Sequence, residues 1–251
     1  MSNSIYKSEE GRLRISKHYE KYLKSFEFDI ERVYVKTTFG ETHVLVAGPT
    51  EGKPLFILQG GNCLNPMTLS WFKPLFEQYR VYAPDTIGHP GYSAQNRVSA
   101  KDDSLACWIA ELMDYFKINR CGFIGPSYGA GIILRLAAFF PERIDCSVLV
   151  SPAGLKLGSK MEMIKKILIP MLLYKSTLSE KHLKKITNVM STNCMKEIDK
   201  SIIGDIFHYV KLERAMPKLT DRKELKNYQS PTLVIAGEQD IFFPEEKVKK
   251  K

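Results

Sequence analysis

The sequence GFIGPSYGAG, residues 122–131, is a short apolar run that gives way to small residues and then continues as an apolar, helix-like segment from Ile132. This order predicts a strand, a very tight turn and a helix, with Ser127 at the apex of the turn. A serine in that place has its hydroxyl clear of the backbone and lies at a helix N-terminus, where free N–H groups can stabilise an oxyanion. Gly125 and Gly129 leave room for the bend, because a Cβ at either position would collide with the neighbouring strand or helix. The pattern G-x-S-x-G makes Ser127 the candidate nucleophile, although Gly and Ser also mark many ordinary loops.

The composition is that of a globular protein with one large core. Of the 251 residues, 44% are hydrophobic and 26% are charged, which is enough to bury a single core with one insertion. The most apolar stretch, residues 167–174, is interrupted by Pro170, and residues 1–14 contain no apolar signal-peptide core. We therefore expect a cytoplasmic protein with no membrane partner.

Charge and cysteine content argue against two other classes of protein. The net charge is +9, but the lysines are spread over helix-like segments without interleaved aromatic residues, so no nucleic-acid partner is expected. The five cysteines are scattered and form no C-x-x-C pair, so neither disulfides nor a zinc site are indicated. We expect reduced, mostly buried thiols, no metal and no cofactor.

Up to about residue 150, strand-like and helix-like segments alternate. Residues 30–38 and 43–47 predict a hairpin around Gly40, and His43 in its second strand is expected at the surface. In the first predicted helix, an apolar stripe that includes Leu13 is expected to face the protein. Alternation at this spacing predicts a mostly parallel sheet with helices on both faces. The further expected strands are 54–58, 80–83, 120–125 and 146–150, and the expected helices are 8–26, 67–76, 103–116 and 132–140.

From about residue 155 to residue 227 the alternation stops. Helix-like segments follow one another at 161–174, 179–190 and 197–214, and most of the methionines fall here. Methionine-rich helices adapt to varied apolar ligands, but simple core packing uses methionine in the same way. Strand character returns at residues 231–236, before a turn that contains Asp240.

With these motifs in order, nearly the whole chain resembles an α/β-hydrolase of the bacterial carboxylesterase-like branch with a helical cap. The matching motifs are the turn at 125–129, the sequence Gln59-Gly60-Gly61, the D-x-x-G-x-x-G-x-S loop at 85–93 and Gly237-x-x-Asp240. The resemblance implies a core at 28–154 and 228–251, a cap at 155–227 inserted after the sixth strand, and an N-terminal helix at 1–27.

The same resemblance assigns roles to individual residues. Ser127 would be the nucleophile, Asp240 the acid that orients a histidine, and the N–H groups of Gly61 and Tyr128 the oxyanion hole. Many members have His-Gly where this chain has Gln59-Gly60, and Pro126 precedes the serine. Neither difference removes a donor, because the donors are backbone groups.

The histidine of the family's catalytic triad has no counterpart, because no histidine follows His208 in this sequence. We therefore expect a C-terminally truncated hydrolase whose last strand and helix are missing. His89 is the only histidine on a loop at the active-site end of the predicted sheet, and it is the candidate for a substitute base.

Two functions remain open from the sequence. The first is a serine hydrolase that cleaves a small carboxylic ester through an acyl-enzyme and is impaired by the absent histidine. The alternative is a non-catalytic binder of a small apolar ligand, or an inactive fragment. In both cases the strand at 231–236 would be an exposed apolar edge, so self-association is expected.

Overall fold

A seven-stranded sheet forms the centre of the protein, which we describe from a computed structural model for residues 4–249. The strand order is β1-β2-β4-β3-β5-β6-β7. The pairs β1–β2 and β2–β4 are antiparallel, and all the other neighbouring pairs are parallel. The strands are β1 Ile30–Thr37, β2 Gly40–Ala47, β3 Lys53–Ile57, β4 Tyr79–Pro84, β5 Cys121–Pro126, β6 Ile144–Val150 and β7 Thr232–Ile235.

Helices cover both faces of this sheet, as the sequence predicts. In β3, Leu55 and Ile57 belong to one buried cluster and Phe56 to the other, because successive side chains of a strand point to opposite faces. The first cluster includes side chains of α1, α2 and α8, and the second those of α3 and α4. The helices of the core and the N-terminus are α1 Glu9–Leu23, α2 Asn65–Leu69, α3 Ser104–Tyr115, α4 Tyr128–Phe139 and α9 Glu245–Val248, with 3-10 turns η1 Lys73–Glu77 and η2 Pro141–Arg143.

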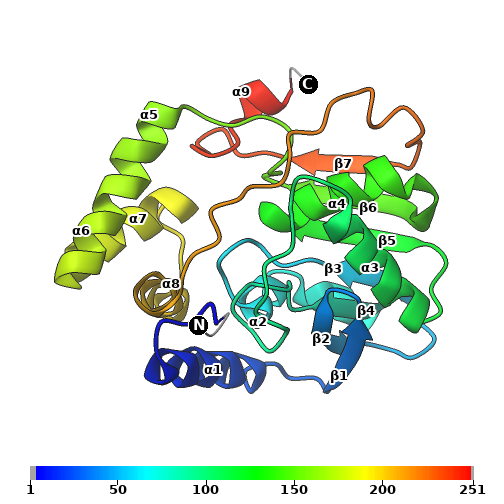
Figure 1. Cartoon of the computed structure of the whole chain (residues 1–251), viewed down its shortest axis with the longest axis horizontal. Coiled ribbons are helices and arrows are strands. Elements are labelled where there is room, and N and C mark those ends of the chain that lie inside the picture. The colour runs from blue at the N-terminus through cyan, green and yellow to red at the C-terminus, as the bar shows by residue number, and fades with distance from the viewer. Residues whose placement is uncertain (1–3, 250–251) are drawn as a thin grey trace.

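A group of helices lies between β6 and β7 in the chain and to one side of the sheet (Figure 1). We call residues 160–209 the helical segment. Its first helix runs without interruption through α5, a π-helical turn and α6, and it is followed by α7 and α8. The elements are α5 Lys160–Met163, η3 Ile164–Leu168, α6 Ile169–Thr177, α7 Glu180–Ser191 and α8 Glu197–Tyr209.

The helix predicted at 67–76 is wrong, because the chain forms the short α2 and then the 3-10 turn η1 instead. Pro74 explains the break, since a proline inside a helix has no N–H to donate and clashes with the carbonyl one turn earlier.

The apolar stripe predicted for α1 is wrong at Leu13, which is 57% exposed. The buried face of α1 consists of Gly11, Ile15, Tyr19 and Tyr22, at the spacing of one helical face.

His43 was predicted at the surface, and this is wrong. The edge strand is β1, so that β2 is covered on both sides, and His43 has no exposed surface.

The expectation of mostly buried thiols is wrong for Cys146 and Cys194, which are exposed, whereas Cys63 and Cys121 are buried.

Candidate functional site

Ser127 stands between the end of β5 and the start of α4 in a backbone conformation that few residues adopt. Its φ is 50° and its ψ is −111°, and a non-glycine residue with such angles is strained. The strain is held by three backbone hydrogen bonds. The N–H of Ser127 donates to Val150 O at 2.8 Å, and its carbonyl accepts from the N–H groups of Gly131 and Ala153, each at 3.1 Å.

The two glycines that flank Ser127 are required by close packing. A Cβ on Gly125 would lie 2.6 Å from the carbonyl carbon of Gly129. A Cβ on Gly129 would lie 2.5 Å from the carbonyl oxygen of Leu58, just past the end of β3. The turn therefore brings helix α4 against the sheet and leaves Ser127 at its apex.

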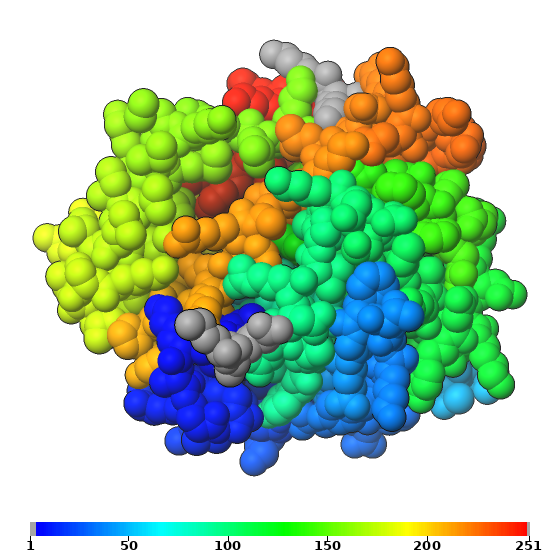
Figure 2. Space-filling model, in the orientation of Figure 1, coloured from blue at the N-terminus to red at the C-terminus, as the bar shows by residue number. Residues whose placement is uncertain are grey.

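Ser127 lines a cavity of about 500 Å³ between the core and the helical segment. The surface in Figure 2 is hollowed between these two parts of the chain. Most of the cavity wall is apolar, which suits the hydrocarbon part of a small ligand. Its lining includes Gly61, Ser127, Met190, Ser191, Met195, Asp199, Ile203, Asp240, Phe242 and Phe243.

Gly61 lines the cavity, and the buried Tyr128 lies next to Gly61. A Cβ on Gly61 would lie 3.1 Å from Tyr128 Cβ, so the two backbones approach closely. The neighbours of Gly61 use their N–H groups, Gly60 toward Thr68 and Asn62 toward His89, but within residues 4–249 the Gly61 N–H has no hydrogen-bond partner. Tyr128 is the first residue of α4, a position whose N–H makes no bond within its helix. Both N–H groups are thus suited to an anionic oxygen.

Asp240 follows β7 and also lines the cavity. Its Oδ1 accepts hydrogen bonds from the N–H groups of Phe242 at 2.8 Å and Phe243 at 3.0 Å. These bonds fix the orientation of the carboxylate. The structure therefore brings Ser127, Gly61 and Asp240 to one cavity from three separate loops.

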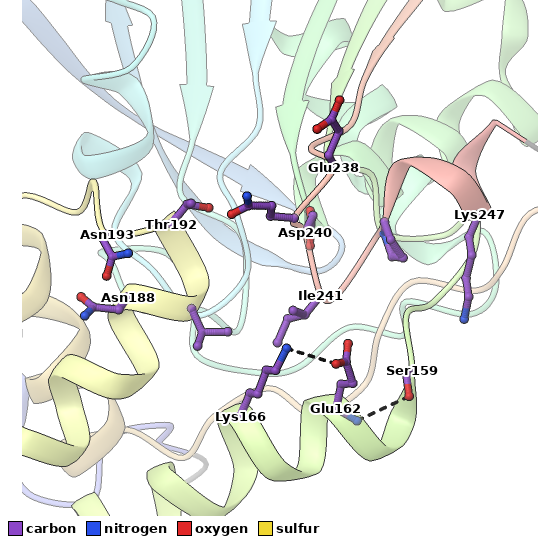
Figure 3. Close-up of a pocket in the computed structure, with 13 residues that line it drawn as sticks. Ser159, Glu162, Lys166, Asn188, Thr192, Asn193, Glu238, Asp240, Ile241 and Lys247 are labelled. Carbon is purple, nitrogen blue, oxygen red and sulfur yellow. Dashed lines mark hydrogen bonds and ion pairs between the residues drawn. The ribbon is translucent and has the colours of Figure 1, made fainter.

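A second hollow of about 580 Å³ begins on the other side of Asp240. Figure 3 shows Asp240 above the helix that carries Glu162 and Lys166, with Thr192 to one side. Glu162 and Lys166 form an ion pair of 3.1 Å. The wall of this hollow has a larger polar share than the wall of the Ser127 cavity, and Asp240 lines both.

His89 does not line the Ser127 cavity. It is 3% exposed, and its Nδ1 accepts the hydrogen bond of the Asn62 N–H at 3.2 Å. Burial, with a smaller contribution from the positive charge of Arg97, lowers the pKa of His89 to about 3. The imidazole is therefore neutral, and it supports the turn that carries Gly61.

All the histidines of the chain lie within the described residues 4–249, and none of them lines the cavity. His18 pairs with Asp205 at 2.6 Å, His43 pairs with Asp85 at 3.0 Å, and the remaining two are His182 in α7 and His208 in α8.

Asp199 is a cavity residue that the sequence analysis did not identify. It is 4% exposed, lies in the first turn of α8 and accepts a hydrogen bond from the Tyr22 hydroxyl at 3.0 Å. Burial raises the pKa of its carboxyl, and the Tyr22 bond offsets part of that effect. No sequence signal separates this acid from the others in the helical segment, because its burial depends on α1, which is distant in the sequence.

In residues 4–249 no group of three or more His, Cys, Asp or Glu side chains is placed to hold a metal ion. Over the same residues no helix has the length and apolar character needed to cross a bilayer.

The chain belongs to the alpha/beta hydrolase fold family, whose sequence pattern matches residues 53–192. This agrees with the fold predicted from the motifs.

Particular relatives are carboxylesterases by name. The chain is 25% identical over 245 residues to carboxylesterase YbfK of Bacillus subtilis, covering 93% of this chain and 80% of that protein. It is 29% identical over 152 residues to the uncharacterized carboxylesterase nap of the same species, covering 61% of this chain and 51% of that protein. The crystal structure of naproxen esterase from Bacillus subtilis has the same fold, with a TM-score of 0.79, 21% identity, and 97% and 88% of the two chains covered.

Proposed function

We propose that this chain is a serine hydrolase of the carboxylesterase type, with Ser127 as the nucleophile. The observation that carries the proposal is the strained Ser127 in the wall of an apolar cavity, beside the unpaired N–H of Gly61 and the fixed carboxylate of Asp240. The carboxylesterase names of the relatives support an ester as the substrate.

The chemistry follows from these positions. The Ser127 hydroxyl attacks the ester carbonyl, the carbonyl oxygen becomes anionic, and the N–H groups of Gly61 and Tyr128 stabilise that charge. The α4 N-terminus, which begins at Tyr128, adds its positive dipole end. The ester C–O bond then breaks, and the alkoxide leaves as the alcohol after taking up a proton that balances the one lost by Ser127 and that solvent water carries. Water then attacks the acyl-enzyme, which releases the acid and restores the Ser127 hydroxyl.

The deprotonation of Ser127 should be the slow step of this reaction, because no histidine base lies at the cavity among the described residues. Asp240 has no histidine to orient at the cavity, and His89 is occupied by the Asn62 N–H. In a well-studied serine protease, loss of the histidine lowers turnover by about 10⁶ and leaves roughly 10³–10⁴ over the reaction in water. We expect ester hydrolysis by this 251-residue chain at that residual level.

The position of the helical segment over the cavity supports its role as a cap. It supplies Met190, Met195 and Ile203 to the cavity, while the core supplies Gly61 and Ser127. We therefore propose the division into a core at 28–154 and 228–251, a cap at 155–227 and an N-terminal helix at 1–27.

A rate comparison with p-nitrophenyl butyrate tests the proposed function. The wild-type chain should exceed the buffer rate, and mass spectrometry after an acid quench should find a butyryl group on Ser127. Ser127→Ala should carry no butyryl group, although part of its rate should remain, because the oxyanion hole and binding act without the serine. Ser191→Ala is the matched control, because it removes a hydroxyl from the wall of the same cavity. A wild type whose Ser127 carries no butyryl group would refute the nucleophile and favour the non-catalytic binder. His89→Ala removes the acceptor of the Asn62 N–H and disturbs the turn at Gly61. It should not lower the rate to that of the buffer, because His89 is not the base.

The exposed edge strand β7 supports our proposal that the chain associates with itself. In β7, Leu233, Val234 and Ile235 are 57%, 40% and 47% exposed, and β6 is the only partner of β7 among residues 4–249. Such an edge can pair with another chain. Sedimentation should show oligomers for the wild type and a shift to monomer for Val234→Lys, and a monomeric wild type would refute this part of the proposal.

A further inference from the structure

A recess of about 760 Å³ lies away from Ser127, where the N-terminal segment meets the helical segment. In Figure 2 the blue N-terminal residues, the yellow-green α6 region and the orange segment after α8 come together on one face. The charged residues that line the recess are all basic: Lys7, Arg97, Lys175, Lys211 and Arg214.

Backbone hydrogen bonds fix the floor of this basic recess. The Lys7 N–H donates to Tyr209 O and the Lys211 N–H donates to Ile5 O, each at 2.8 Å. The Ile5 N–H donates to Gln95 Oε1 at 3.1 Å. The chain segments that carry the two lysines are therefore held together, although they are distant in the sequence.

Only one of the basic side chains is neutralised by a carboxylate. Arg97 pairs with Glu213 at 3.3 Å. Lys7 and Lys211 donate to the backbone carbonyls of His208 and Ser4, which carry no net charge.

Within residues 4–249 no carboxylate lies within ion-pair distance of Lys7, Lys175, Lys211 or Arg214. The recess thus carries uncompensated positive charge.

Lys7, Lys175 and Arg214 of the recess lie close enough for their positive charges to repel one another. Burial lowers the pKa of Lys175, and the positive charges of Lys7 and Arg214 lower it further. Burial also lowers the pKa of Lys7. A bound anion would remove this repulsion, since an opposite charge stabilises the protonated form of a lysine.

We propose that the basic recess binds a small anion with several negative charges, of the polyphosphate or phosphate-ester class. Ammonium and guanidinium groups are the usual ligands of phosphate oxygens, and the recess gathers five of them against the single carboxylate of Glu213 among the described residues. The recess has the volume of a small-molecule site. Its concave shape favours a small ligand over a flat membrane surface. The proposal does not depend on the chemistry at Ser127.

Calorimetric titration with pyrophosphate at low ionic strength tests this site. The wild type should bind, and the double variant Lys7→Gln/Lys175→Gln should bind about tenfold more weakly or worse, because it loses two charge-assisted contacts. Lys226→Gln is the control, since it removes an exposed positive charge outside the recess. Ser127→Ala should bind as the wild type does.

Thermal unfolding provides a second measurement, because it compares each variant with itself, with and without pyrophosphate, and so does not require the variants to have equal stability. Pyrophosphate should raise the Tm of the wild type and of Lys226→Gln, because a ligand stabilises the state that binds it. It should not raise the Tm of the folded double variant. No binding by the wild type, or equal losses in the double variant and Lys226→Gln, would overturn the proposal. Binding to phosphatidylglycerol vesicles without binding to pyrophosphate would also overturn it, in favour of a membrane surface.

Discussion

Removal of one hydroxyl, in Tyr19→Phe, tests how α1 is attached to the core. The Tyr19 hydroxyl donates to Asp85 Oδ1 at 2.7 Å, and both residues are fully buried. Asp85 Oδ2 is bonded separately, by the Tyr92 N–H at 2.8 Å and by His43 Nδ1 at 3.0 Å. Arg32 Nε donates to His43 Nε2 at 3.0 Å, which leaves the His43 proton on Nδ1 to donate to Asp85.

The cost of the substitution can be worked from this geometry. A phenyl ring fills the same space, so no large cavity forms, but the buried Oδ1 of Asp85 loses its donor. A hydrogen bond to a charged group contributes about 1.5–3 kcal/mol. For a protein of this size, 1 kcal/mol corresponds to about 2–4 °C in Tm. We therefore expect the Tm to fall by about 3–12 °C.

Thermal and urea unfolding of Tyr19→Phe, with Tyr92→Phe as the control, would measure this cost. The Tyr92 hydroxyl donates to Glu20 Oε1 at 2.6 Å, but the Glu20 side chain is 39% exposed, so its loss should cost under about 1 kcal/mol. The reasoning is refuted if Tyr19→Phe lies within about 0.5 kcal/mol of the wild type, the range of ordinary surface substitutions, or costs no more than Tyr92→Phe.

Two other substitutions test the turn at Ser127 and a buried ion pair. Gly129→Ala should destabilise the protein by about 1–3 kcal/mol and lower ester hydrolysis, because its Cβ would lie 2.5 Å from Leu58 O; unchanged urea unfolding would contradict this. Glu224→Gln should cost about 3 kcal/mol at pH 7, because it leaves the fully buried Arg135 without its carboxylate partner, which lies at 2.7 Å. Burial alone would raise the pKa of Glu224, but the hydrogen bonds from Arg135, Lys218 and the Asp221 N–H, with the positive charge of Arg135, together outweigh burial and lower the pKa from 4.5 to about 2. The stabilisation is thus present above pH 4.5 and lost as the pH falls toward 2. The difference in unfolding free energy between wild type and Glu224→Gln should therefore shrink over that range. A difference that does not change with pH would contradict the pairing.

The parts of the fold that depend on local sequence could be predicted. The strand, turn and helix around Ser127 are encoded by neighbouring residues, and the glycines at 125 and 129 show the close approach directly. The buried strands could be predicted for the same reason, since an apolar run between turn residues is a local signal.

The parts that depend on distant contacts could not be predicted. His43 is buried because Tyr19 of α1, Asp85 and Arg32 surround it, and none of these is its neighbour in the sequence. Asp199 becomes a cavity residue for the same reason, through Tyr22. The break in the helix predicted at 67–76 is a different case. Pro74 is a local signal for that break, but the prediction followed the helix-like apolar pattern of the segment.

The pairing of α1 with α8 has a consequence for synthesis on the ribosome. Arg14 in α1 bonds to Asp205 in α8, 191 residues later, and Ile15 on the same helix is buried in a cluster that includes Ile202, Ile203 and Ile206 of α8. At about 5–20 residues per second, translation separates the two helices by roughly 10–40 s. During that interval the apolar face of α1 has no partner from α8, so the nascent chain offers a binding site for chaperones that the finished protein covers.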